Sequence, residues 1–225
     1  KYLKVGYDNV NANLKAYVAM RSLPTLPAGS MITEAKLNLI YNGASEGNLA
    51  ANPLTIVAKK IIRTGYTSLW TESSTTYNTA MTYGDILDYK IIAGSTAGNV
   101  EDWNITSAVV DWYANSTSNQ GVALMPYDMT DTTVHTVQFH SSDNSMTGAY
   151  TPFFTIAYVS AIGVEGYYSY QSASAGLAGT GYVNTATGAL TFVKPLLSTT
   201  DSLMPYTVSM TYNSDFAGKA YQYPN

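Results

Sequence analysis

The stretch Ala35-Lys36-Leu37-Asn38-Leu39-Ile40-Tyr41 decides the fold class that the sequence predicts. Its first, third, fifth and seventh residues are apolar or aromatic, which is the period of two of a strand with one buried face. Gly43 then opens a polar loop that runs to Pro53. We expect a strand here, with its odd-numbered side chains in a core.

Further short strands are expected on both sides of this stretch, because small groups of apolar residues alternate with turn residues. They lie at 54–58 with 61–62, at 91–92, at 122–124, at 137–139 and at 154–158. Residues 23–29 include two prolines and a glycine, and they form a rigid turn that cannot continue a central strand. Many short strands separated by turns are typical of a sandwich or barrel.

One segment has the period of a helix instead. The apolar face of this helix is formed by Ile105, Ala108, Val109 and Trp112. Asn104 or Thr106 could cap its start, because either side chain can accept from the first free backbone N–H groups. We expect a helix of two to three turns that closes one end of the sandwich.

The character of the sequence changes at about residue 160. Residues 163–189 are rich in Gly, Ala, Ser and Tyr, and two strand-like runs follow at 189–193 and 205–212. We therefore predict a sandwich domain at 1–159 and a second β region at 160–225. Because the chain starts in strand-like alternation and stops just after a strand-like run, we expect it to be a piece of a longer protein.

The composition excludes several classes of protein. Only 12% of residues are charged, whereas tyrosine accounts for 20 of 225, a mixture typical of a β-rich extracellular protein. A net charge of −4 with only Arg21 and Arg63 as arginines provides no basic patch for nucleic acid. No apolar run is long enough to predict a transmembrane helix. Since the chain has no cysteine, disulfides and thiolate metal sites are excluded.

Catalysis has little support in the sequence. The only histidines, His135 and His140, are five residues apart on a predicted strand and so point to opposite faces. No Gly-x-Ser-x-Gly motif is present, although the many serines and aspartates leave a hidden triad open. We therefore expect the protein not to be an enzyme.

Small clusters of acidic residues leave three interpretations open. The clusters are Asp8 with Asn9, Glu101 with Asp102, and Asp128 with Asp131. They could be solvated loop acids, oxygen ligands of a Ca²⁺ ion or catalytic carboxylates acting on a glycoside, and no Asp-x-Asp-x-Asp-Gly spacing selects the second. If Ca²⁺ is bound, we expect Asp8, Asn9 and Asp102 to hold it.

Aromatic residues provide the remaining indication of a binding site. Trp70 and Trp112 follow apolar patterns, so we expect both in the core. Trp103 lies between two polar residues and could stack on a sugar ring through its flat face. We predict Trp103, Tyr77 and Arg21 as glycan-binding residues.

Residues 1–159 resemble a DNRLRE domain. The matching motifs are Ala16-Tyr17-Val18-Ala19-Met20, the turn and strand at 23–39, Trp70-Thr71-Glu72, Thr75-Thr76-Tyr77-Asn78, Trp103-Asn104-Ile105-Thr106 to Asp111-Trp112, the run at 119–124, Phe139-His140-Ser141-Ser142 and the run at 152–158. Met20-Arg21 stands where the family has Phe-Asp, and Tyr77 replaces a tryptophan. The family's first strand starts before Lys1. The resemblance implies a jelly-roll β-sandwich on bacterial surface proteins, with carbohydrate-binding modules among its relatives, some of which bind alginate.

The following residues resemble the start of an Rhs/YD-repeat shell. The motifs are Gly163-Val164-Glu165-Gly166-Tyr167-Tyr168-Ser169-Tyr170, the glycine-rich run at 176–184, Thr187-Gly188-Ala189-Leu190-Thr191-Phe192, and Met204-Pro205-Tyr206 with Thr211-Tyr212-Asn213. Proteins of this family are large, secreted or attached to the cell wall, and often tipped with toxins. A DNRLRE-like domain often precedes the shell, so the order of the two resemblances agrees with the family.

The sequence thus predicts an all-β chain, in which a jelly-roll sandwich with one short helix precedes the start of a YD-repeat shell. The predicted function is that of a non-catalytic structural or adhesive module, extracellular or cell-wall associated. Its expected partners are the remainder of its YD-repeat protein and a cell-surface polysaccharide. The alternatives are a carbohydrate-binding module with a Ca²⁺-supported site and a self-associating fibre subunit, whose incomplete first strand leaves an edge open to strand addition.

Overall fold

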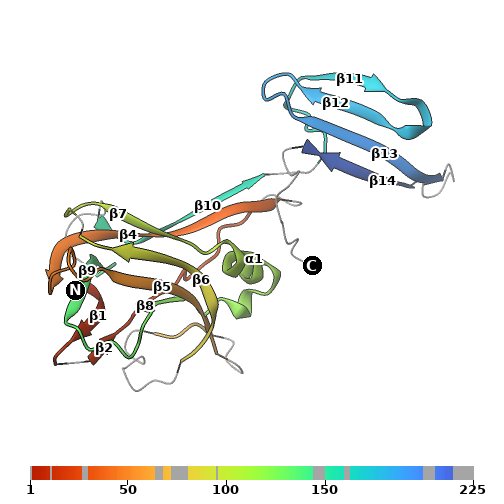
Figure 1. Cartoon of the computed structure of the whole chain (residues 1–225). Helices are drawn as coiled ribbons and strands as arrows, with labels where there is room; N and C mark the ends of the chain where they lie inside the picture. Colours follow the sequence, from red (N-terminus) through yellow and green to blue (C-terminus); the bar gives the residue numbers. More distant parts are fainter. Residues whose placement is uncertain are drawn as a thin grey trace. The chain divides into compact units, whose positions relative to one another are not determined.

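The computed structural model describes residues 2–10, 12–26, 30–63, 68–71, 81–94, 96–143, 150–159, 163–199 and 206–214. These residues form an all-β protein with one α-helix (Figure 1), as the sequence predicts. The chain divides into two compact units, Lys1–Pro24 with Glu34–Ala157 and Thr25–Thr33 with Tyr158–Tyr223. The last three residues of the turn predicted at 23–29 lie outside the described residues.

The described part of the first unit contains two antiparallel sheets. One has the strand order β10-β4-β9-β1-β2, with β7 also paired to β4, and the other has the order β3-β8-β5-β6. The strands are β1 (Tyr2–Asp8), β2 (Ala12–Leu14), β3 (Ala16–Val18), β4 (Met31–Glu46), β5 (Leu54–Ile62), β6 (Thr82–Ile92), β7 (Val100–Asn104), β8 (Val122–Pro126), β9 (His135–His140) and β10 (Phe153–Val159).

The stretch that predicted the fold lies in β4. Its odd-numbered side chains at 35–41 are buried, which confirms the predicted strand. Asn38 and Ile40 on the other face are buried as well, and the Asn38 side-chain amide donates to the Thr155 hydroxyl of β10 at 2.6 Å. This part of β4 is therefore covered on both faces.

The core of the sandwich joins the two sheets through aromatic side chains. Trp103 of β7 packs edge-on against Phe139 of β9, with ring centroids 5.9 Å apart. Its indole N–H donates to the carbonyl oxygen of Ile56 in β5 of the other sheet at 3.3 Å. Each large side chain buried in this way contributes about 1.5–3 kcal/mol through the hydrophobic effect.

The predicted helix is confirmed as α1 (Thr106–Ala114) and lies at one end of the sandwich (Figure 1). The N-cap position is Ile105, which makes no side-chain capping hydrogen bond, so neither Asn104 nor Thr106 caps the helix as predicted; the Asn104 side-chain oxygen accepts instead from the backbone N–H of Thr106, the first helical residue, at 3.0 Å. A 3₁₀ turn, η2 (Ser116–Ser118), follows the helix. Among the described residues no helix is long and apolar enough to cross a membrane.

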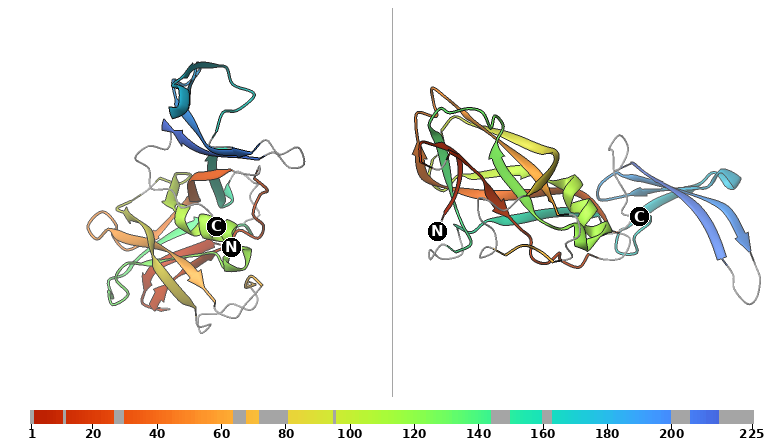
Figure 2. Two further views of the ribbon diagram at one scale, coloured as in Figure 1. Left: turned by 90° about the vertical axis from the view of Figure 1, so that its right-hand side faces the viewer. Right: turned by 90° about the horizontal axis from the view of Figure 1, so that it is seen from below.

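The second unit contains a four-stranded antiparallel meander, which Figure 2 shows as a single layer. Its strands are β11 (Tyr170–Ser174), β12 (Thr180–Asn184), β13 (Leu190–Thr199) and β14 (Tyr206–Asn213), with the 3₁₀ turn η4 (Gly176–Ala178) between the first two. The strand-like runs predicted at 189–193 and 205–212 correspond to β13 and β14. The glycine-rich run before them contains β11 and β12, which the sequence analysis did not identify as strands.

Candidate functional site

A pocket of about 330 Å³ lies in the first unit, where the ends of β1, β3, β9 and β10 meet. Four aromatic residues line it: Tyr2, Tyr17, Trp70 and Phe154. The polar and charged residues of the lining are Arg21, Ser141, Ser142 and Asp143. Apolar residues complete it, namely Leu3, Val18, Ala19, Leu69 and Pro152. Because these residues come from segments far apart in the sequence, only the strand pairing brings them together.

Strand register explains one side of the pocket. β1 pairs antiparallel with β9, and Tyr2 lies opposite His140. The residues that follow β9, Ser141 to Asp143, therefore emerge beside the start of β1. Ser141, Ser142 and Asp143 in this way line the same pocket as Tyr2.

The opposite side of the pocket is set by a close backbone approach. β3 pairs with β8, with Val18 opposite Val122, and the preceding Gly121 has a φ of +83°. A Cβ atom at Gly121 would lie 2.5 Å from the Val18 carbonyl oxygen, so only glycine fits at this point. This contact fixes the direction in which the chain leaves β3 toward Arg21.

Trp70 forms the floor and is held rigidly. It is 9% exposed, and its indole N–H donates to the Gln120 carbonyl oxygen at 2.8 Å. The Tyr17 ring packs edge-on against it at 6.1 Å, and the Tyr17 hydroxyl lies 2.7 Å from that of Tyr83. Burial, together with this hydrogen bond, raises the pKa of Tyr83, so its phenol stays neutral at physiological pH. The floor is therefore uncharged and aromatic.

The rim carries a free cation. Arg21 is exposed, and among the described residues its guanidinium makes no hydrogen bond or ion pair. Tyr2 is also exposed and packs against His140, with ring centroids 5.9 Å apart. Asp143, by contrast, already has an interaction within the protein. The pocket thus presents one uncommitted positive charge beside aromatic rings and hydroxyl groups.

The structure places the three predicted glycan-binding residues differently. Arg21 lines the pocket. Trp103 is 0% exposed, so its prediction as a stacking residue is wrong: its side chain points between the sheets and has no face open to a ligand. Tyr77 lies outside the described residues.

The predicted calcium ligands do not form one site. Asp8, at the end of β1, accepts hydrogen bonds from the Val10 backbone N–H and from Lys4, which also pairs with Glu46 at the end of β4. Asp102 lies opposite Asn38 of β4, which is eight residues before Glu46 and, with the β-bulge between Tyr41 and Ser45, roughly 20 Å away along the strand. Since Asp8 and Asp102 cannot reach the same ion, the predicted set is wrong, and Asn9 next to Asp8 does not change this.

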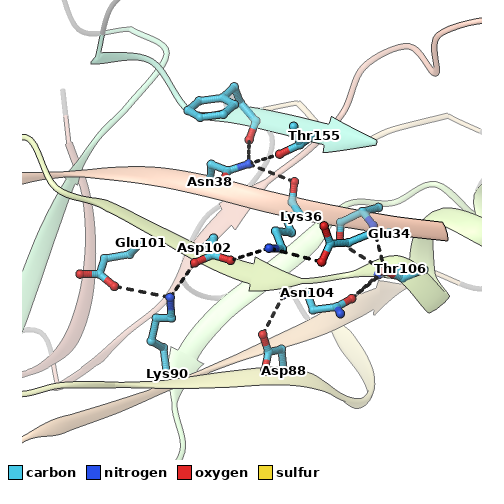
Figure 3. Close-up of polar contacts among 12 residues, drawn as sticks. Glu34, Lys36, Asn38, Asp88, Lys90, Glu101, Asp102, Asn104, Thr106 and Thr155 are labelled. Carbon is cyan, nitrogen blue, oxygen red and sulfur yellow. Dashed lines mark hydrogen bonds and ion pairs between the residues drawn. The ribbon is translucent and has the colours of Figure 1, made fainter. Parts of the chain in front are cut away.

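Asp102 belongs instead to a chain of ion pairs across β4, β7 and β6 (Figure 3). Its carboxylate lies 2.7 Å from the Lys90 ammonium and 3.5 Å from that of Lys36. Lys90 is also 3.8 Å from Glu101, and Lys36 is 3.3 Å from Glu34. The hydrogen bond from Lys90, with the charge of Lys36, lowers the pKa of Asp102. Because Lys90 belongs to one sheet and Lys36 to the other, these ion pairs link the two sheets.

The two histidines lie on β9 and are both buried. His135 contacts the Asp131 carboxylate at 3.3 Å, whereas His140 packs against Tyr2 and Tyr150. Their separation of five residues corresponds to about 17 Å along the strand. They therefore cannot act on the same ligand.

Most of the pocket was missed by the sequence analysis. Tyr2, Tyr17, Phe154 and the polar run after β9 are residues of ordinary strands and turns in the sequence. The motifs Phe139-His140-Ser141-Ser142 and Pro152-Phe153-Phe154 were recognised, but only as closing strands. The one sequence feature that pointed to the pocket was Arg21, because the chain has only two arginines.

No protein-family model matches the chain, and no curated protein matches it. The resemblance to DNRLRE and Rhs/YD-repeat proteins accordingly stays a prediction from sequence motifs. The candidate site is defined by its geometry.

Proposed function

We propose that this chain is a non-catalytic structural and adhesive module of a bacterial surface or secreted protein, and that its sandwich binds a sugar of a cell-surface polysaccharide in the pocket. The observation that carries this proposal is the unpaired guanidinium of Arg21 at the rim of an aromatic-floored pocket. A cation that has no partner among the described residues is available for an anion outside the protein.

The lining suits a saccharide with an acidic group. The half-buried Phe154 ring and the exposed Tyr2 ring offer flat faces to the C–H side of a sugar, while Ser142 supplies a hydroxyl for the sugar hydroxyls. A guanidinium can bind a carboxylate or sulfate through two parallel hydrogen bonds. A pocket of about 330 Å³ is at the lower end of the range for ligand sites, so we expect one or two sugar units to occupy it.

The context of the module follows from its resemblances. The DNRLRE-like motifs and the following Rhs/YD-like motifs favour a position just before a repeat shell, on the cell surface or in the wall. The antiparallel meander β11–β14 is suited to continue into further β structure. In this role the sandwich attaches the larger protein to a glycan, and the remainder of that protein is its other partner.

Binding of the full chain to acidic and neutral polysaccharides tests the proposal. We expect binding to an acidic glycan, measured by isothermal titration, and a loss of roughly tenfold or more in affinity for Arg21→Ala, because one charge-assisted contact is removed. Arg21→Lys should retain part of the affinity, since it keeps the charge but not the two-pronged geometry.

Lys59→Ala is the matched control, because it removes a cation of β5 that does not line the pocket. The Lys59→Ala variant should bind the acidic glycan with the same affinity as the unaltered chain. Absence of binding across the panel, or equal losses for the Arg21 and Lys59 variants, would overturn the proposed function.

A further inference from the structure

One face of the sheet of the second unit is apolar along β14, whereas the other combines polar residues with Tyr170, Tyr182 and Val193. Along β14, Val208, Met210 and Tyr212 alternate with hydroxyl and amide residues. Successive side chains of a strand point to opposite faces, so the three apolar side chains share a face. The alternation covers the described side chains of β14, Thr207 to Asn213.

Strand register extends this face over three strands. Tyr212 lies opposite Phe192, and Val208 lies opposite Leu197 beyond a β-bulge in β13. Phe192 lies opposite Gly181 of β12, and a Cβ atom at nearby Gly179 would meet the Phe192 ring at 2.9 Å. The ring therefore lies across β12 on the same side. We call the set Val183, Leu190, Leu197, Val208, Met210 and Tyr212, with Phe192 at its centre, the apolar face.

The apolar face is the more exposed of the two faces of this sheet. The six outer residues of the apolar face are 37–56% exposed. On the other face, Thr191 and Asn184 are only 3% and 6% exposed, and the Tyr170 hydroxyl accepts from the backbone N–H of Glu165 at 3.1 Å. A one-sided antiparallel sheet normally buries its apolar side, so the apolar face lacks a cover among the described residues.

We propose that the apolar face binds the same face of a second copy of this chain, so that two sheets pack as a sandwich about a two-fold axis. Facing sheets pack about 10 Å apart with their strands roughly aligned. A two-fold axis pairs each surface with itself, and the two copies therefore match in strand length and in apolar character.

The charge of the face favours such a partner. Lys194, opposite Met210, is its one charged side chain at a described position. An acidic partner would find a single cation there, whereas an apolar partner can cover the rest of the face. The long Lys194 stem can lie on the apolar surface with its ammonium at the rim.

The area of the face sets the expected affinity. With strands about 4.8 Å apart and a rise of about 3.4 Å per residue, the three strands of the apolar face present roughly 400 Å². A pair of such faces buries roughly 800 Å², which is below the roughly 1,000 Å² of a stable specific interface and in the range of a weak one. We therefore expect a reversible dimer that dissociates on dilution, and its residues are separate from those of the pocket.

Sedimentation equilibrium of the full chain over a dilution series tests the proposal, with Met210→Glu and Ser209→Glu as a matched pair. The two residues are adjacent and exposed on β14 but lie on opposite faces. We expect the unaltered chain and Ser209→Glu to dimerise equally. Met210→Glu should raise the dissociation constant by roughly tenfold, since the dimer would bury the new carboxylate together with the facing Lys194 ammonium, and removing both charges from water costs more than their attraction returns.

A single introduced cysteine identifies the geometry, because the chain has none. Spin labels on Met210→Cys should approach each other in the dimer, and those on Ser209→Cys should lie farther apart by the thickness of both sheets. A monomer at every concentration would overturn the proposal. The apolar face would then be covered by a different protein or by the sandwich unit of the same chain. Equal effects of the two glutamate variants, or short label distances at position 209, would overturn the proposal in favour of pairing through strand edges or the opposite face.

Discussion

Asp102 is the residue on which the ion pairs between β4, β6 and β7 converge (Figure 3). Lys90 and Lys36, from strands of different sheets, lie on either side of its carboxylate. The side chain is 36% exposed, so water screens these contacts, and such pairs contribute at most about 1 kcal/mol. Their importance lies in which strands they connect.

Asp102→Asn should lower the free energy of unfolding at neutral pH by up to about 1 kcal/mol. The pKa of Asp102 is lowered in the folded state, so its contribution is complete above the unfolded pKa of about 3.9 and disappears as the pH falls through the lowered value. Urea unfolding of both proteins, from pH 7 down to the acid range, should show the difference shrinking to zero.

Asp85→Asn is the control for this prediction. Asp85 is an exposed residue of β6, and its carboxylate makes no ion pair among the described residues. Its substitution should leave the stability nearly unchanged throughout. A constant difference between Asp102→Asn and the unaltered chain at every pH would show that the ion pairs contribute nothing.

At the scale of elements, the junction between β3 and β8 shapes the pocket. Gly121 precedes β8 with a positive φ, and a Cβ atom at this position would lie 2.5 Å from the Val18 carbonyl oxygen of β3. The chain then continues from β3 through Ala19 to Arg21. The position of the rim cation therefore depends on a backbone contact that only a glycine allows.

Gly121→Ala should destabilise the sandwich by more than the roughly 1–2 kcal/mol expected from left-handed strain alone, because its methyl group would also displace β3. Gly98→Ala is the control that measures the backbone strain alone. Gly98 also has a positive φ, of +90°, but there is open space within 4 Å of the position that an alanine methyl group would occupy. Thermal unfolding of both variants measures the difference. Equal destabilisation would show that β3 moves aside without cost.

At the scale of the whole molecule, the two compact units contain separate sheets. The sandwich buries a large aromatic core, including Trp103, Trp112 and Phe139. The sheet of the second unit has few buried side chains among its described residues, such as Thr191 and Asn184. We therefore expect the two units to differ in stability and in what stabilises them.

Differential scanning calorimetry of the full chain should resolve two transitions. A saccharide bound in the pocket should raise only the transition of the sandwich, since a ligand stabilises the state that binds it. Dilution should lower only the transition of the second unit if its apolar face is covered by a second copy. A single transition that responds to both changes as a whole would contradict this expectation.

The sequence by itself determined the class of the fold and its local elements. Alternation at 35–41 predicted a buried strand, the spacing from Ile105 to Trp112 predicted α1, and the runs at 189–193 and 205–212 predicted the last two strands. These features depend on side-chain period and turn chemistry, which are local properties and can be read without knowing what packs against them.

Only the tertiary structure decided which residues meet. Trp103 lies between polar neighbours in the sequence, yet the pairing of β7 with β4 directs its ring into the core. Asp8 and Asp102 carry suitable oxygen ligands, but they lie on strands whose register keeps them apart. Arg21 joins Tyr2 and Trp70 in one pocket because β1 pairs with β9 and β3 with β8. Which residues meet depends on non-local strand order and register, and these are properties that the local period of a sequence does not contain.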